Sequence, residues 1–258
     1  MNSKIIVYAG AVGLVIVASW MYVNTPVVRL VGVPTVSKDI ALPINWGDYS
    51  AQMQKLGVID PQKMNVTVNG PRIIMTKENS HELLNLFWAF GLANKNPILK
   101  EGPMMDPRYG GAQRFASTGG WSLAAGDPMS HYNTHEMVTL TPDQQALVER
   151  VSKNIYRPCC DNSTYFPDCN HGMAMLGLLE LMAAQNVSEQ EMYGVALAVN
   201  RFWFSSQYEV IDQYLAKEKI IASPKEILSA RYSSASGYRN VISTLKPKTQ
   251  GGGSSCSA

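Results

Sequence analysis

Apolar residues recur every three to four positions along several stretches of the chain, which is the pattern of helices that bury one face. The clearest stretch begins at Thr141, where a hydroxyl residue followed by Pro142 is typical of a helix start. This helix should end near Tyr156, because Pro158 disfavours helical geometry in the residue before it. Its apolar face consists of Leu147, Val148, Val151 and Ile155.

A second helix is predicted from about His171 to Gln185, and it is apolar on nearly all sides. Asp168 or Asn170 can cap its start. Glu180 is its only charged residue, and we expect this side chain to face solvent because acids are seldom fully buried. Together the two helices predict an αα-hairpin with a cysteine-rich connecting loop.

The remaining patterns predict a mainly α-helical fold that is irregular around this αα-hairpin. One β-hairpin is expected, in which Val66–Val68 pairs with Arg72–Met75 across the Asn69-Gly70 turn, a dipeptide typical of tight hairpins. Residues 96–133 show no clear period but are rich in Gly, Pro and Met, so we expect them to lie over the helical core. Further helical patterns occur within 46–57, 81–95, 189–218 and 224–231.

Residues Ile5 to Val23 carry no charge and are about long enough to cross a bilayer, given ~20 residues per span. We therefore predict a single-pass membrane anchor with the folded part on the extracytoplasmic side, and a cleaved signal peptide is the alternative. A protein partner in the membrane or envelope fits this placement. The predicted organisation is a transmembrane anchor at 1–24, an extended stalk at 25–45, a helical domain at 46–245 and a disordered tail at 246–258.

Composition and missing motifs argue against several function classes. The chain has 22 basic and 20 acidic residues without a long run of either sign, so we expect no nucleic-acid partner. It contains no Walker loop, no Gly-x-Gly-x-x-Gly, no Gly-x-Ser-x-Gly and no Cys-x-x-Cys-His haem attachment motif, so nucleotide-dependent, hydrolytic and c-haem roles lose their usual support. No catalytic residue follows from the sequence.

The candidate chemistry is concentrated between residues 159 and 171, where three of the four cysteines and one of the four histidines lie. Three thiolates and an imidazole form a ligand set that suits zinc, copper or iron. We therefore predict a metal centre, and His131 and His135, four residues apart, could add imidazoles to it. The predicted ligands, called the cysteine cluster below, are Cys159, Cys160, Cys169 and His171.

Two other interpretations of the same residues stay open. In a thiol-disulfide redox protein, Cys159 or Cys160 would attack and Cys169 would resolve, with Arg157 and the helix start lowering the pKa of the thiols. In an assembly or adhesion protein, a disulfide from Cys159 or Cys160 to Cys169 would only staple the loop and stabilise it by roughly 2 to 4 kcal/mol. The staple leaves an odd thiol, free to pair with Cys256 or with a partner.

Four phrases of the chain resemble those of an uncharacterised family of prokaryotic, membrane-anchored proteins: NWGDYSAQMQKLGVID, LLNLFWAFGLANKNPILKEGPM, FASTGGW and IYRPCCDNSTYFPDCNHGMAMLGLLELM. The resemblance covers most of residues 46–238 and implies no activity. In layout, Pro158-Cys159-Cys160 with Cys169 is also similar to the thiol proteins of cytochrome c maturation and to the lipoproteins named for a Pro-Cys-Tyr-Cys-Gly-Cys motif. The adjacent cysteines and the Cys-Asn-His sequence depart from both patterns.

Overall fold

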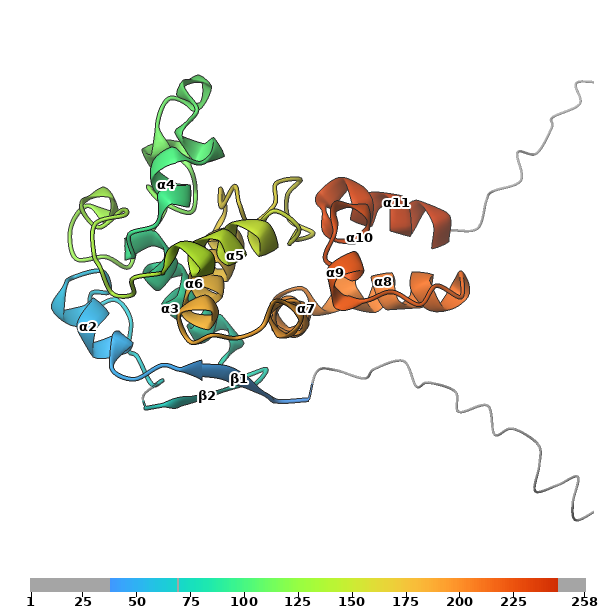
Figure 1. Cartoon of the computed structure of the whole chain (residues 1–258), viewed down its shortest axis with the longest axis horizontal. Helices are drawn as coiled ribbons and strands as arrows, with labels where there is room; N and C mark the ends of the chain where they lie inside the picture. The colour runs from blue at the N-terminus through green and yellow to red at the C-terminus, as the bar shows by residue number, and fades with distance from the viewer. Residues whose placement is uncertain (1–37, 69, 246–258) are drawn as a thin grey trace, which may run out of the picture. The chain divides into compact units, whose positions relative to one another are not determined.

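The computed structural model describes residues 38–68 and 70–245 (Figure 1). This part of the chain is mainly helical with one two-stranded antiparallel sheet, which confirms the mainly α-helical part of the predicted fold class. None of its helices is both long enough and apolar enough to cross a membrane. The predicted anchor at 1–24 and the predicted tail at 246–258 lie outside the described residues.

Helices α3 (Ser80–Ala93) and α6 (Asn170–Ala184) form the centre of the molecule and are both almost fully buried. They cross where each helix has a glycine, Gly91 and Gly177. A Cβ added to Gly177 would lie 2.6 Å from the carbonyl oxygen of Phe87 and 2.8 Å from the amide nitrogen of Gly91. The two backbones therefore approach more closely than any larger residue at position 177 would allow.

Helix α5 (Pro142–Ser152) packs on α6, and residues 153–169 connect the two helices. Its start has the expected cap, because Thr141 and Gln144 each bond the other's backbone amide. The capping predicted for the second helix differs in part, because Asn170 accepts the amide of His171 at the helix start but neither Asn170 nor Asp168 is the N-cap residue. Cys169 is the N-cap of α6 and its side chain makes no capping bond. The carboxylate of Asp168 instead accepts hydrogen bonds from Arg157 and Asn162.

The sheet pairs β1 (Ile40–Asn45) with β2 (Arg72–Met75), so the predicted partner of Arg72–Met75 was wrong. Residues 66–68 form no strand, because the amides of Thr67 and Val68 donate to the carboxylate of Glu82 on α3. β1 comes from the end of the segment predicted as an extended stalk. Its conformation is extended as expected, but it is built into the domain. The residues of the two strands that face the core are Leu42, Ile44, Ile73 and Met75.

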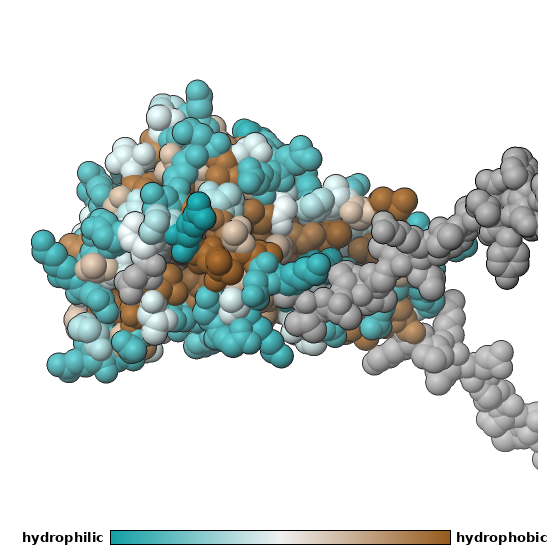
Figure 2. All heavy atoms as spheres, turned by 90° about the horizontal axis from the view of Figure 1, so that it is seen from below, coloured by the Kyte–Doolittle hydropathy of each residue, from teal (hydrophilic) through white to brown (hydrophobic). Residues whose placement is uncertain are grey.

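Figure 2 shows the molecule from below, the side on which the sheet lies in Figure 1. Hydrophobic residues form a band across the middle of this face, and hydrophilic residues border it. On β2, Ile74 alternates with the buried Ile73 and Met75 and is 55% exposed. The sheet therefore uses one face for the core and leaves the other open, as is usual for antiparallel pairs.

The C-terminal part begins with α7 (Glu189–Trp203), which bends at Phe204 into α8 (Ser205–Lys217). Three shorter helices follow, α9 (Pro224–Ile227), α10 (Ala230–Ser233) and α11 (Ala235–Leu245), and α11 packs on α8. Near the start of the domain lies α2 (Tyr49–Lys55), and α4 (Pro97–Glu101) follows α3.

Residues 102–140 form turns and short 3₁₀ segments that cover the core, which agrees with the prediction for most of residues 96–133, whereas the start of that range forms α4. Trp121 shows how this irregular segment is held. Its side chain is 1% exposed, and its indole N–H donates to the carbonyl of Val58. The segment is therefore anchored by side chains that fill the core as well as by its own turns.

Candidate metal centre

The structure brings the residues of the cysteine cluster together. Cys159 and Cys160 lie in the loop after α5, Cys169 caps α6, and His171 is in the first turn of α6. The ligand atoms of Cys159, Cys169 and His171 all lie within 4.8 Å of one another. A second set that shares Cys169 adds Cys160 and Asp168. Thiol, imidazole and carboxylate groups therefore meet in one place that could hold a metal ion.

The loop that carries Cys159 and Cys160 is held by the C-terminal helices. The amide of Tyr156 donates to the carbonyl of Leu228, and the amide of Ala235 donates to the carbonyl of Cys160. Asp161 accepts hydrogen bonds of 2.7 Å from both the amide and the hydroxyl of Ser236, at the start of α11. These contacts come from residues more than sixty positions away in the sequence, so the loop geometry depends on tertiary structure.

The thiols of Cys159 and Cys169 are close but not bonded. Their sulfur atoms are 3.6 Å apart, whereas a disulfide needs about 2.05 Å. All three described cysteines are free thiols, and Cys159 is exposed. Two sulfur ligands of a tetrahedral zinc ion stand about 3.8 Å apart when each bond is about 2.3 Å. The observed separation thus fits two ligands of one metal ion with a small adjustment.

Arg157 is the cation of this site and is only 1% exposed. Its Nε donates to the sulfur of Cys169 at 2.9 Å, and its Nη2 donates to Oδ1 of Asp168 at 2.7 Å. The guanidinium also donates to the carbonyls of Asn162 and Phe166. Gly172 makes room for it, since a Cβ at that position would lie 2.6 Å from Cζ of Arg157. The buried positive charge of Arg157 therefore contacts Cys169, the residue that both sets of ligands share.

Because they share hydrogen bonds, the three thiols differ in acidity. Hydrogen bonds from the thiols of Cys159 and Cys160 hold the pKa of Cys169 far below its ordinary value, and His171 and Arg157 act in the same direction. The pKa of Cys159 is raised, first by its hydrogen bond with Cys160 and then by that with Cys169. The bond with Cys159 lowers the pKa of Cys160, but Cys169 and burial outweigh it and raise this pKa to about 11. The thiol of Cys169 is therefore more acidic than those of Cys159 and Cys160.

The imidazole of His171 is oriented by aromatic rings from the end of α7. Its ring centroid lies 4.4 Å from that of Phe204 and 5.7 Å from that of Trp203. Such contacts restrict the ring to few orientations. The aromatic residues after position 200 thus contribute to the site, a role that their helical spacing alone did not indicate.

His131 and His135 form a pair of their own. Nδ1 of His131 lies 3.2 Å from Nε2 of His135, and the ring centroids are 5.5 Å apart. The two imidazoles therefore lie within hydrogen-bond distance of each other through these nitrogen atoms. Neither histidine belongs to the two sets of grouped ligand atoms found among the described residues. Burial, followed by the charges of His131 and Lys95, lowers the pKa of His135.

Glu180 is fully buried on α6, so the prediction that it faces solvent was wrong. Its Oε2 accepts a 2.7 Å hydrogen bond from Asn94, whose own oxygen accepts the amides of Met137 and Val138. Burial raises the pKa of Glu180 well above its usual value, although the amides of Asn94 and Asn96 oppose the shift. Because α6 is covered on every side, no solvent-facing position was left for its one acid.

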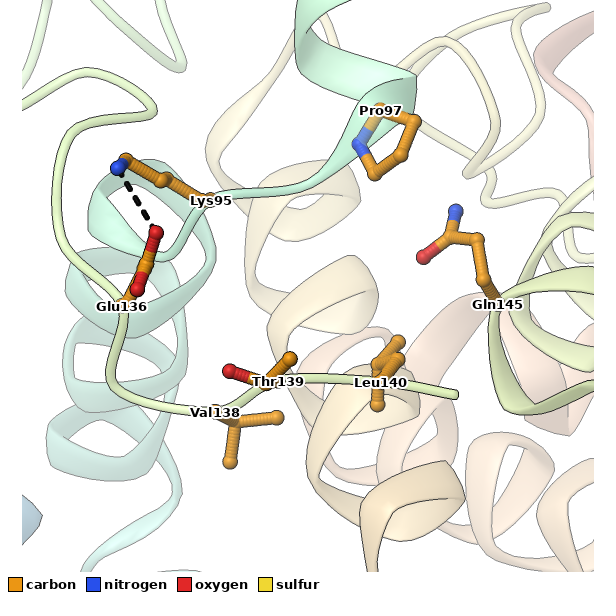
Figure 3. Close-up of a pocket in the computed structure, with 7 residues that line it drawn as sticks. All are labelled: Lys95, Pro97, Glu136, Val138, Thr139, Leu140 and Gln145. Atoms are coloured by element: carbon orange, nitrogen blue, oxygen red, sulfur yellow. Dashed lines mark hydrogen bonds and ion pairs between the residues drawn. The ribbon is translucent and has the colours of Figure 1, made fainter. Parts of the chain in front are cut away.

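A surface pocket of about 250 Å³ lies near this polar network (Figure 3). Lys95 and Glu136 form an ion pair of 3.0 Å at one side, and Gln145 lies across from them. The side-chain amide of Gln145 pairs with that of Asn96, which links the pocket wall to the interior. The remaining lining residues are Pro97, Val138, Thr139 and Leu140. The pocket has no thiol or imidazole in its lining, so it is separate from the cysteine cluster.

Comparisons with protein-family models, with curated proteins and with solved structures gave no match to this chain.

Proposed function

We propose that this chain is a metal-binding protein whose ion is held by Cys159, Cys160, Cys169 and His171. The observation that carries the proposal is the convergence of the ligand atoms of Cys159, Cys169 and His171 within 4.8 Å. The sulfur of Cys160 lies 3.8 Å from Oδ1 of Asp168 and within 4.8 Å of the same shared thiol, and we assign it as the fourth ligand.

The donor types narrow the choice of metal. Thiolate and imidazole ligands suit zinc, copper or iron and are poor ligands for magnesium or calcium. Arg157 adds a positive charge that offsets the surplus negative charge of three thiolates around a divalent ion. On the predicted membrane anchor at Ile5 to Val23, the centre would stand on the extracytoplasmic side of a membrane.

Elemental analysis of the purified full-length chain tests the proposal. We expect one zinc, copper or iron ion per chain, and free thiols after the ion is removed by a chelator. Cys169→Ser should abolish metal binding because both ligand sets share this sulfur. Metal-free protein that takes up no zinc, copper or iron under reducing conditions would contradict the proposal.

A matched histidine pair sharpens the experiment. His171 is the second residue of α6, and His81 is the second residue of α3 and is exposed. His171→Ala should weaken metal binding strongly, while His81→Ala should leave it unchanged. Equal effects of the two substitutions would show that the imidazole of His171 is not a ligand.

A thiol-disulfide redox protein is the second candidate, supported by the 3.6 Å separation of the Cys159 and Cys169 sulfur atoms. It requires a reversible disulfide and needs no metal. Purified chain without metal, in which these two cysteines cycle between thiol and disulfide, would favour this candidate. An inert disulfide without metal would favour the stapling role instead.

A further inference from the structure

We infer that Cys159 and Cys169 are the oxidisable pair of the cysteine cluster, and that closing their disulfide expels the bound metal. This inference rests on the proposed function, because it describes how that same metal site is regulated. It also selects one disulfide from the two that the sequence left open.

The positions of the three sulfur atoms distinguish Cys159 from Cys160. The sulfur of Cys159 lies 3.6 Å from that of Cys169 and needs to approach by only about 1.6 Å to reach bonding distance. The sulfur of Cys160 instead faces oxygen atoms, the carbonyl of Asn162 and Oδ1 of Asp168, each at 3.8 Å. The backbone carbonyl of Cys160 is also tied to Ala235. Cys159 is therefore the thiol placed to bond Cys169.

The three thiols also differ in their exposure to solvent. Cys159 is exposed, whereas Cys160 and Cys169 are partly covered. An external oxidant of the disulfide class therefore meets Cys159 first. Cys169 lies behind it with its sulfur held by Nε of Arg157 at 2.9 Å, which keeps it aimed at the site. One thiol faces solvent and its partner is positioned next to it, as thiol-disulfide exchange requires.

The reaction proceeds in two balanced steps. The sulfur of Cys159 attacks a small disulfide RSSR, the S–S bond of RSSR breaks, and one RS⁻ leaves while the proton of the thiol goes to solvent. The sulfur of Cys169 then attacks the Cys159 sulfur of this mixed disulfide, and the second RS⁻ leaves. The two cysteines are oxidised together by two electrons, and one RSSR is reduced to two thiols.

Metal binding and this disulfide exclude each other because they use the same sulfur atoms. Once Cys159 and Cys169 are bonded, only Cys160 and His171 of the four ligands remain. Two ligands are too few for the closed tetrahedral sites that hold zinc tightly. The metal in turn protects the pair, since a bound ion occupies both sulfur atoms.

Glutathione disulfide is a suitable probe, used on the full chain carrying Cys256→Ser so that only the three cysteines of the cluster remain. Zinc-loaded protein should release one zinc ion per chain as two glutathione thiols appear. Peptide mapping should show a Cys159 to Cys169 disulfide. If only the metal-free form reacts, free zinc at a hundred times its Kd should slow the reaction about a hundredfold.

Variants of the metal-free protein test which cysteines pair. Cys160→Ser should form the disulfide at the rate of the parent chain, while Cys159→Ser should form no internal disulfide. A Cys160 to Cys169 bond in the parent chain would overturn the inference, and so would zinc that stays bound after the Cys159 to Cys169 bond has formed. Both results would leave the proposed function intact. Failure to bind any metal would overturn the proposed function and, with it, this inference.

Discussion

Nη2 of Arg157 lies 2.7 Å from Oδ1 of Asp168, and the guanidinium that makes this ion pair is almost completely buried. Removing one partner of a buried ion pair leaves the other charge without compensation. Arg157→Met should therefore lower the free energy of unfolding by roughly 3 to 5 kcal/mol, as measured by chemical denaturation followed by tryptophan fluorescence. Arg108→Met is the control, because Arg108 forms its ion pair with Asp106 at the exposed surface. Equal losses in the two variants would contradict a special role for Arg157.

We expect that stability depends on Gly172 only because its missing side chain leaves space for Arg157. In Gly172→Ala the new methyl would displace the guanidinium, so we expect a clear loss of stability in the parent chain. In an Arg157→Met background the same change should cost much less, because the group it collides with is gone. A double-mutant cycle measured by denaturation gives this coupling. Additive effects would mean that Gly172 serves another purpose.

The crossing of α3 and α6 predicts a strong response at Gly177. Its added Cβ would meet backbone atoms of Phe87 and Gly91, which cannot rotate away. Gly177→Ala should destabilise the fold by roughly 1 to 3 kcal/mol. Gly194→Ala, within α7, is the matched control, since a Cβ there meets nothing within 4 Å. That change should stabilise by about 0.5 to 1 kcal/mol through helix propensity. A neutral Gly177→Ala would show that the helices can separate at little cost.

Glu180 predicts how stability varies with pH. Its folded pKa is raised well above 4.5, so above about pH 4.5 the folded state keeps a proton that the unfolded state has released. Stability should then fall as pH rises, by up to about 1.4 kcal/mol per pH unit, until the folded pKa is reached. Glu180→Gln cannot ionise and should remove this contribution. The variant should therefore gain stability relative to the parent between pH 4.5 and pH 8 in urea titrations. If the difference in stability between parent and variant were the same at pH 4.5 and at pH 8, the raised pKa of Glu180 would be contradicted.

Much of the local structure could be predicted from short-range signals. Thr141 and Pro142 mark the start of α5, and the apolar run after His171 marks α6, because caps and helical periodicity depend only on neighbouring residues. The spacing of Cys159, Cys160, Cys169 and His171 across one αα-hairpin loop also indicated a local centre. Residues 153–169 begin and end at two packed helices, which limits how far apart their side chains can lie.

Contacts between segments far apart in the sequence could not be predicted in the same way. Strand Arg72–Met75 was predicted from the Asn69-Gly70 turn before it, but it pairs with Ile40–Asn45, and the carboxylate of Glu82 accepts the amides of the nearer segment instead. The burial of Glu180 likewise depends on the elements packed around α6, not on its own sequence.

The amino-acid sequence by itself determined the main helices, one of the two strands and the closeness of the cysteines along the chain, because each depends on contacts over a few residues. Only the tertiary structure decided that Arg157 lies buried against Cys169 and that Cys159, not Cys160, faces that sulfur. These arrangements depend on α9 to α11 holding the loop and on Gly172 leaving space for the guanidinium. Such contacts join distant parts of the chain and form only when the whole domain packs.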